Sequence, residues 1–178
     1  MIERLFIPSH GPDFPSLKHG LEWLLSQNNS LILFVSNLGF LKRRMLLEIL
    51  GADICNKLIK NKTATYKNKK ISVITYKMIR FTREIDSSII PSNSSILCVH
   101  STPKDLEKIE KYLKFKKIMV IPWATYQDLF NWINNYHVEQ YDDFIPIDPR
   151  NLPGYDKHMH EKFRFRYQNI PYEDYQKQ

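Results

Sequence analysis

An imidazole and two hydroxyl groups follow one another at His100, Ser101 and Thr102, directly after the apolar run Ile96–Val99. A proline and an aspartate come next, an order typical of a strand that leads into a capped helix. The dipole of that helix would lower the pKa of the histidine and favour a neutral ring. If the chain is an enzyme acting at a phosphoryl or glycosyl centre, His100 is the predicted acid or base. Ser101 and Thr102 are predicted to bind the ligand, although a helix cap and a satisfied strand-end histidine would explain the same residues.

Two further groups of candidate ligand-binding residues follow apolar runs. Ser36, Asn37 and Gly39 come after Leu31–Val35 and precede three consecutive basic residues, which could hold a phosphate. Neither GxxxxGK[ST] nor GxGxxG occurs, so a Walker-type or standard dinucleotide site is not supported, and an ordinary turn is the alternative. Trp123 could stack on a flat ring or pack in the core.

Lysine and arginine are concentrated in the middle of the chain. Residues 61–120 hold 13 basic and 5 acidic side chains, whereas the whole chain has a net charge of +7. Basic groups neutralise phosphates and aromatic rings stack on bases, so this region is the predicted nucleic-acid-binding surface. Its predicted contacts are Lys67, Lys69, Lys70, Lys77, Arg80 and Arg83. An AT-rich genome, or a lysine-rich hairpin edge that resists aggregation, would give the same composition.

The sequence indicates neither a metal centre nor a disulfide framework, and it does not identify a cofactor. His158 and His160 precede Glu161, but no third ligand follows at metal spacing. The two cysteines, Cys55 and Cys98, fit buried thiols in a reducing compartment. No secretory-signal pattern and no run of about 18 apolar residues is present, so we expect a cytoplasmic protein without membrane contact.

The elements that must position these residues alternate between strand and helix patterns. The predicted strands are five short apolar runs, at Leu5–Ile7, Leu31–Val35, Ile71–Thr75, Ile96–Val99 and Ile118–Ile121. Continuous apolar runs are typical of strands covered on both faces, and segments of helical period separate them. One helix is predicted over Phe40–Lys60, where Gly51 could divide it, and Asn68 could turn a hairpin into the strand at Ile71–Thr75. We therefore predict an α/β fold, a Rossmann-like three-layer domain with a mainly parallel sheet of about five strands. In such sheets ligands bind beyond the carboxyl ends of the strands, where the candidate residues lie.

The predicted α/β domain covers residues 1–140, and residues 141–178 form an irregular tail rich in proline and aromatic residues. So many aromatic residues suggest that the tail packs on the domain or on a partner. Three functions stay open. The domain binds a nucleotide or other phosphorylated small molecule at the strand ends, with or without catalysis. Alternatively, it binds nucleic acid through residues 57–83, or it is an accessory subunit or homo-oligomer that docks through the tail.

Overall fold

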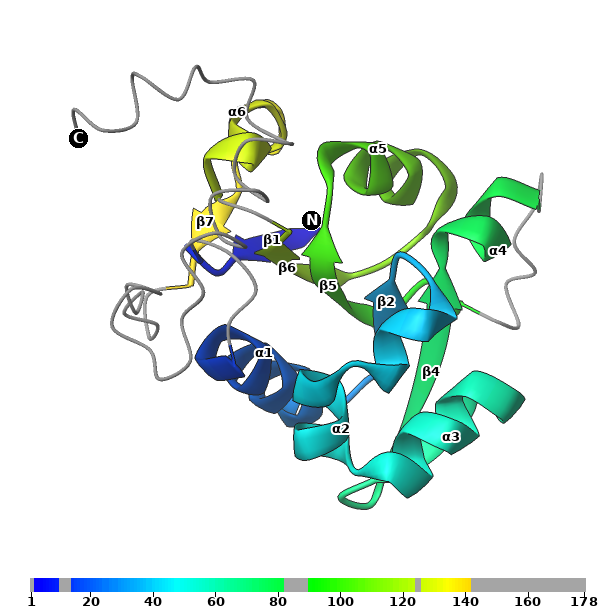
Figure 1. The fold of residues 1–178 in the computed structure, drawn as a ribbon. Helices are drawn as coiled ribbons and strands as arrows, with labels where there is room; N and C mark the ends of the chain where they lie inside the picture. The colour runs from blue at the N-terminus through cyan, green and yellow to red at the C-terminus, as the bar shows by residue number, and fades with distance from the viewer. Residues whose placement is uncertain (1, 10–13, 82–89, 124–125, 142–178) are drawn as a thin grey trace.

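The computed structural model describes residues 2–9, 14–81, 90–123 and 126–141, in which strands alternate with helices (Figure 1). The strands are β1 (Glu3–Phe6), β2 (Leu31–Val35), β3 (Thr63–Tyr66), β4 (Lys69–Thr75), β5 (Ser95–Ser101), β6 (Lys117–Pro122) and β7 (Glu139–Gln140). The α-helices are α1 (Phe14–Ser26), α2 (Arg44–Leu50), α3 (Ala52–Asn61), α4 (Tyr76–Phe81), α5 (Pro103–Tyr112) and α6 (Phe130–Tyr136). Two 3₁₀ helices, η1 (Leu38–Lys42) and η2 (Tyr126–Leu129), precede α2 and α6.

The described strands form one sheet in the order β3-β4-β2-β5-β6-β1-β7. Every neighbouring pair is parallel except β3 and β4. The five predicted strands are β1, β2, β4, β5 and β6, which confirms the mainly parallel α/β architecture. The two strands that the apolar pattern missed, β3 and β7, are short and lie at the edges of the sheet.

The hairpin between β3 and β4 turns at Lys67 and Asn68. Both residues have a positive φ, 46° and 62° respectively. A two-residue hairpin turn with two positive φ values matches the twist of the flanking strands, and asparagine tolerates this conformation. The structure thus confirms the hairpin that Asn68 was predicted to form.

Helices cover both faces of the sheet, which accounts for the continuous apolar runs. Leu33 belongs to a core cluster that includes residues of α1, α2 and α3, whereas its neighbour Phe34 belongs to a second cluster with α4, α5 and α6. Figure 1 shows these two groups of helices on opposite sides of the sheet. Because successive side chains of a strand point to opposite faces, a strand between two helical layers must be apolar at every position.

The long helix predicted over Phe40–Lys60 is divided at Gly51. This glycine has a φ of 84°, which other residues rarely adopt, and it separates α2 from α3. The division lets Leu46 and Leu58, one from each helix, both reach the first core cluster. The sequence had indicated that Gly51 could divide this helix, and it does.

Gly20 allows α1 to lie close to the sheet. A β-carbon at this position would come within 2.8 Å of Ile121 Cδ1 and 2.9 Å of Leu97 Cδ1. We therefore expect Gly20→Ala to lower the free energy of unfolding by about 1–3 kcal/mol, although alanine favours the helix itself. Thermal unfolding would measure this. Gly39→Ala is the control, because the exposed Gly39 faces only the Asn37 side chain, and equal melting temperatures would contradict close packing at Gly20.

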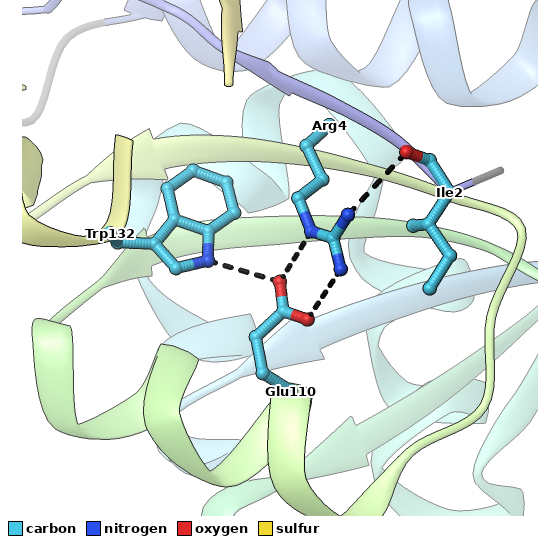
Figure 2. Close-up of polar contacts among 4 residues, drawn as sticks. All are labelled: Ile2, Arg4, Glu110 and Trp132. Carbon is cyan, nitrogen blue, oxygen red and sulfur yellow. Dashed lines mark hydrogen bonds and ion pairs between the residues drawn. The ribbon is translucent and has the colours of Figure 1, made fainter. Parts of the chain in front are cut away.

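A buried ion pair joins β1 to α5 and α6 (Figure 2). Arg4 donates from Nε and Nη2 to the two carboxylate oxygens of Glu110, each at 2.9 Å, and Trp132 Nε1 donates to the same carboxylate at 3.0 Å. Only 15% of the Arg4 side chain and 6% of the Glu110 side chain are exposed. The Arg4 guanidinium also lies 4.7 Å from the centre of the Tyr136 ring. This network fixes the helical layer on β1, and no pattern in the sequence had indicated it.

Both cysteines are free and buried, as predicted. Burial raises the pKa of each thiol, so neither is poised to act as a thiolate. Among the described residues, no helix is long and apolar enough to cross a membrane. The same residues contain no group of three or more metal-ligating side chains, while His158 and His160 lie outside them.

Candidate functional site at the carboxyl edge of the sheet

The chain leaves the neighbouring strands β2 and β5 in opposite directions. After β2 it crosses one face through α2 and α3 to reach β4, and after β5 it crosses the other face through α5 to reach β6. A crevice forms at the carboxyl ends of a parallel sheet wherever adjacent connections diverge in this way. The predicted ligand-binding residues Ser36, Ser101 and Thr102 follow or end these two strands, so the topology brings them to one place.

Asp105 connects the two sides of this crevice. Its Oδ2 accepts hydrogen bonds from Thr102 N and Thr102 Oγ1, each at 2.9 Å, and from Ser36 Oγ at 3.4 Å. Thr102 Oγ1 in turn accepts from Asp105 N, which completes a capping box at the start of α5. The predicted helix cap at Thr102 is therefore present. It places a carboxylate at the helix N-terminus, where an anionic ligand would otherwise be favoured.

His100 occupies an irregularity at the end of β5. Its neighbours Val99 and Ser101 pair with Ile121 and Pro122 of β6, so His100 is an extra residue in the ladder, with a φ of 49°. Such a bulge redirects the side chains that follow it. The imidazole consequently points toward the first core cluster.

Two aromatic rings enclose the imidazole of His100. The Phe40 ring centre lies 5.1 Å from it and the Trp123 ring centre 5.9 Å, both in edge-to-face arrangements. His100 is only 1% exposed. In the described part of the chain, neither ring nitrogen has a hydrogen-bond partner.

The His100 imidazole is neutral in this environment. Burial lowers its pKa from 6.5 to about 3, and the positive charge of Arg43 contributes in the same direction. The sequence predicted a neutral ring through the dipole of α5, whereas desolvation is the main cause here. A ring that is neutral and shielded from solvent cannot donate a proton as an imidazolium at neutral pH.

Arg43 places a positive charge at the same edge. Its guanidinium carbon lies 4.6 Å from the centre of the Phe40 ring and 5.3 Å from that of Trp123. Cation–π attraction to both rings favours this position of the guanidinium. Arg43 is exposed, so its N–H donors are accessible. The sequence contained Arg43 within a basic triplet but gave no means to choose it over Lys42 or Arg44.

A small hollow opens beside these residues. It has a volume of about 130 Å³ and is lined by Ser101, Thr102, Pro103, Trp123 and Asp128. Three of the predicted ligand-binding residues thus share one depression. The hollow alone is smaller than the roughly 300–1,000 Å³ of typical small-molecule pockets, so a ligand would extend beyond it along the edge.

The remaining predicted ligand-binding residues, Asn37 and Gly39, lie in the loop after β2 and at the start of η1. Both are exposed, and the Asn37 side chain does not cap η1. They are near the crevice in the chain, but no described contact joins them to His100 or Thr102. No sequence pattern had indicated Phe40 or Asp128 as part of this site. Asp105 could have been found as the last residue of a Thr-x-x-Asp capping pattern.

The predicted nucleic-acid-binding residues divide between two edges of the sheet. Lys67, Lys69 and Lys70 lie at the hairpin and the amino end of β4, whereas Lys77 lies in α4, beyond its carboxyl end. A strand of this length spans roughly 20 Å. Arg80 belongs to α4, and Arg83 lies outside the described residues. The structure therefore does not bring the named lysines together into one surface.

The boundary of the predicted tail falls at the last described residue. Tyr141 N donates to Phe6 O at 2.9 Å, which continues the pairing of β7 with β1 by one residue. Residues 142–178 lie outside the described part, so docking through the tail stays a prediction. Comparison of the chain with protein-family models, curated proteins and solved structures found no match to any of them.

Proposed function

We propose that this domain binds a nucleotide or other phosphorylated small ligand across the carboxyl ends of β2, β5 and β6. One observation carries the proposal: at the edge where the connections diverge, an exposed guanidinium lies over two aromatic rings, near a hollow lined by hydroxyl and carboxylate groups. Ligands of open α/β sheets bind at such crevices. The guanidinium can bind an anionic group of the ligand, and the hydroxyl and carboxylate groups of the hollow can bind a polar, uncharged part of it.

Arg43 is the proposed phosphate-binding residue. Guanidinium groups bind phosphate through two parallel hydrogen bonds, and a guanidinium already positioned over two rings loses little freedom on binding. The N-terminus of α5 is less suitable, because Thr102 and the Asp105 carboxylate already satisfy it. A phosphate near Asp105 would also be repelled by the like charge.

The uncharged part of the ligand is assigned to the hollow. Carboxylates accept hydrogen bonds from hydroxyl groups, so Asp128 and the hydroxyls of Ser101 and Thr102 suit a ribose or another sugar ring. In this arrangement the phosphate lies toward Arg43 and the sugar toward α5. His100 does not line the hollow, and it packs against Trp123 as a neutral, buried ring. The proposal is for binding, and it assigns no proton transfer to His100.

Arg43→Ala is expected to weaken binding of a responsive nucleotide or sugar phosphate by about ten- to a hundredfold. This range follows from about 1.5–3 kcal/mol for a hydrogen bond to a charged group. The affinity would be measured by isothermal titration calorimetry, after a screen of ligands by thermal shift identifies a compound that binds the full chain.

Arg44→Ala provides the matched control for Arg43→Ala. Arg44 is the next residue, its side chain is 91% exposed, and it pairs with Glu48 at 2.6 Å instead of lying over the rings. The Arg44→Ala substitution therefore removes one positive charge from the same end of α2 as Arg43→Ala does. Equal losses of affinity in both variants would show only a general charge effect, and no loss in Arg43→Ala would contradict the assignment.

A further inference from the structure

A second recess lies at the opposite, amino edge of the sheet. It has a volume of about 540 Å³, within the roughly 300–1,000 Å³ typical of small-molecule sites. Its lining comes from the loop before β2, the first residues of β2 and β4, and the segment before β5. These residues are Gln27, Asn28, Asn29, Ser30, Leu31, Ile32, Lys69, Lys70, Ser72 and Pro91.

The recess is bounded by the face of the sheet that carries α4. Ile32 belongs to the second core cluster and pairs in register with Ser72, so both point to that face. Helix α4 starts at the carboxyl end of β4 and has six residues, which extend about 9 Å, whereas the seven-residue strand spans more than twice that length. Helix α4 itself therefore does not reach the amino end of β4.

All charged side chains among the described residues that line the recess are positive. Lys69 and Lys70 are its only ionisable members, and no carboxylate lines it. Lys69 Nζ donates to Gln27 O at 2.6 Å, which fixes the ammonium while leaving two of its three donors for another acceptor. Two lysines without a carboxylate favour a dianionic group such as a phosphate monoester.

Neutral groups of the recess suit a ligand that also carries donors. Asn29 Oδ1 is buried and has no hydrogen-bond donor within the described residues. Leaving such an oxygen unpaired is unfavourable, and a ligand hydroxyl could satisfy it. Half-buried Ser30 and Ser72 add further small polar side chains to the lining.

We propose that this recess is a second binding site, which takes a small phosphorylated molecule bearing hydroxyl groups, with the phosphate at Lys69 and Lys70. The site is independent of the one at Arg43, because the two lie at opposite ends of β2. The volume of the recess matches that of a small-molecule site. Lys77, which a strand would also need, lies beyond the other end of β4.

The test compares Lys70→Gln with Lys67→Gln in the full chain. Both lysines are exposed and removal of either costs one charge, but Lys67 does not line the recess. Titrations with inorganic phosphate, glucose 6-phosphate and glucose would be followed by the backbone amide resonances of Asn29 and Ser72. We expect both phosphates to shift these resonances and glucose 6-phosphate to bind more tightly. Lys70→Gln should weaken binding about tenfold, whereas Lys67→Gln should leave it unchanged.

The same titrations can overturn the proposal. Resonances of Asn29 and Ser72 that do not respond to millimolar phosphate or glucose 6-phosphate would exclude the site. Equal weakening in both lysine variants would also contradict it. If these resonances respond to oligothymidylate in a salt-sensitive manner, but not to the small phosphates, the recess is part of a nucleic-acid-binding surface instead. Arg43→Ala should not affect these resonances, so failure at one edge of the sheet is distinguishable from failure at the other.

Discussion

Replacing Glu110 by alanine is expected to lower the free energy of unfolding by about 3–5 kcal/mol, the largest effect we expect from one substitution in this chain. The change removes the only carboxylate that contacts Arg4 within the described residues. The guanidinium would then stay largely buried against the Tyr136 ring without a carboxylate to pair with its charge. For a domain of this size we expect the melting temperature to fall by roughly 10 °C.

Hydrogen bonding explains why the loss should be so large. Glu110 accepts two bonds from Arg4 and one from Trp132 Nε1, so alanine leaves three partly buried donors without this partner. The bond to Glu110 also raises the pKa of Arg4, and arginine remains charged at any accessible pH. The protein therefore cannot avoid the buried charge by releasing a proton.

Glu107→Ala is the matched control for Glu110→Ala. Glu107 lies one turn earlier in α5 and is exposed, so its removal should change stability by less than about 0.5 kcal/mol. In the double variant Arg4→Met with Glu110→Leu, both charges are absent, and most of the stability should return. Denaturant unfolding of all variants would provide the free energies. Similar values for the two glutamate variants would show that the ion pair is not held as the structure indicates.

The sequence predicted the fold well because the decisive features are local. A strand between two helical layers is apolar at each position, and the five central strands were recognised from such runs. The capping pattern at Thr102 and the glycine at position 51 are local as well, and both were confirmed. The ion pair is different. Arg4 and Glu110 are separated by 106 positions, and each resembles an ordinary charged residue until the fold brings β1 beneath α5.

The candidate site was predictable in position but not in geometry. The rule that ligands bind at the carboxyl ends of strands selected Ser36, Ser101 and Thr102, and the topology places them on two adjacent strands. The extra residue in the β5 ladder has no sequence pattern. It results from pairing with β6, and it determines that His100 lies between Phe40 and Trp123 instead of facing solvent.

Acid should destabilise this protein through His100. The imidazole has a pKa of about 3 in the folded chain and an ordinary value of 6.5 when unfolded. Below pH 6.5 the unfolded chain binds a proton that the folded chain excludes, so stability falls as the pH falls and levels off near pH 3. Between about pH 6 and pH 4 the loss from this one group should be about 2–3 kcal/mol.

His100→Asn removes the titrating group while keeping a residue that tolerates the left-handed conformation at this position. Both proteins should lose stability between pH 6 and pH 4, but the loss should be smaller in the variant. The difference between the two losses should equal the amount assigned to His100, whatever the stability of the variant at neutral pH. His137→Asn is the control. His137 has a φ of 50°, close to the 49° of His100, but it is exposed. Because this ring is exposed, its replacement should change the free energy of unfolding by less than about 0.5 kcal/mol.

A second measurement does not depend on how well His100→Asn folds. The Cε1 proton resonance of His100 in the wild-type protein should stay at its neutral position as the pH falls, until the chain unfolds. If this resonance instead titrates near pH 6.5 in the folded protein, the ring gains a proton without unfolding. The free energy of unfolding would then depend on pH in the same way in the wild type and in His100→Asn. The enclosure by Phe40 and Trp123 would have to open to solvent, and His100 would become a credible proton donor to a ligand bound at this edge.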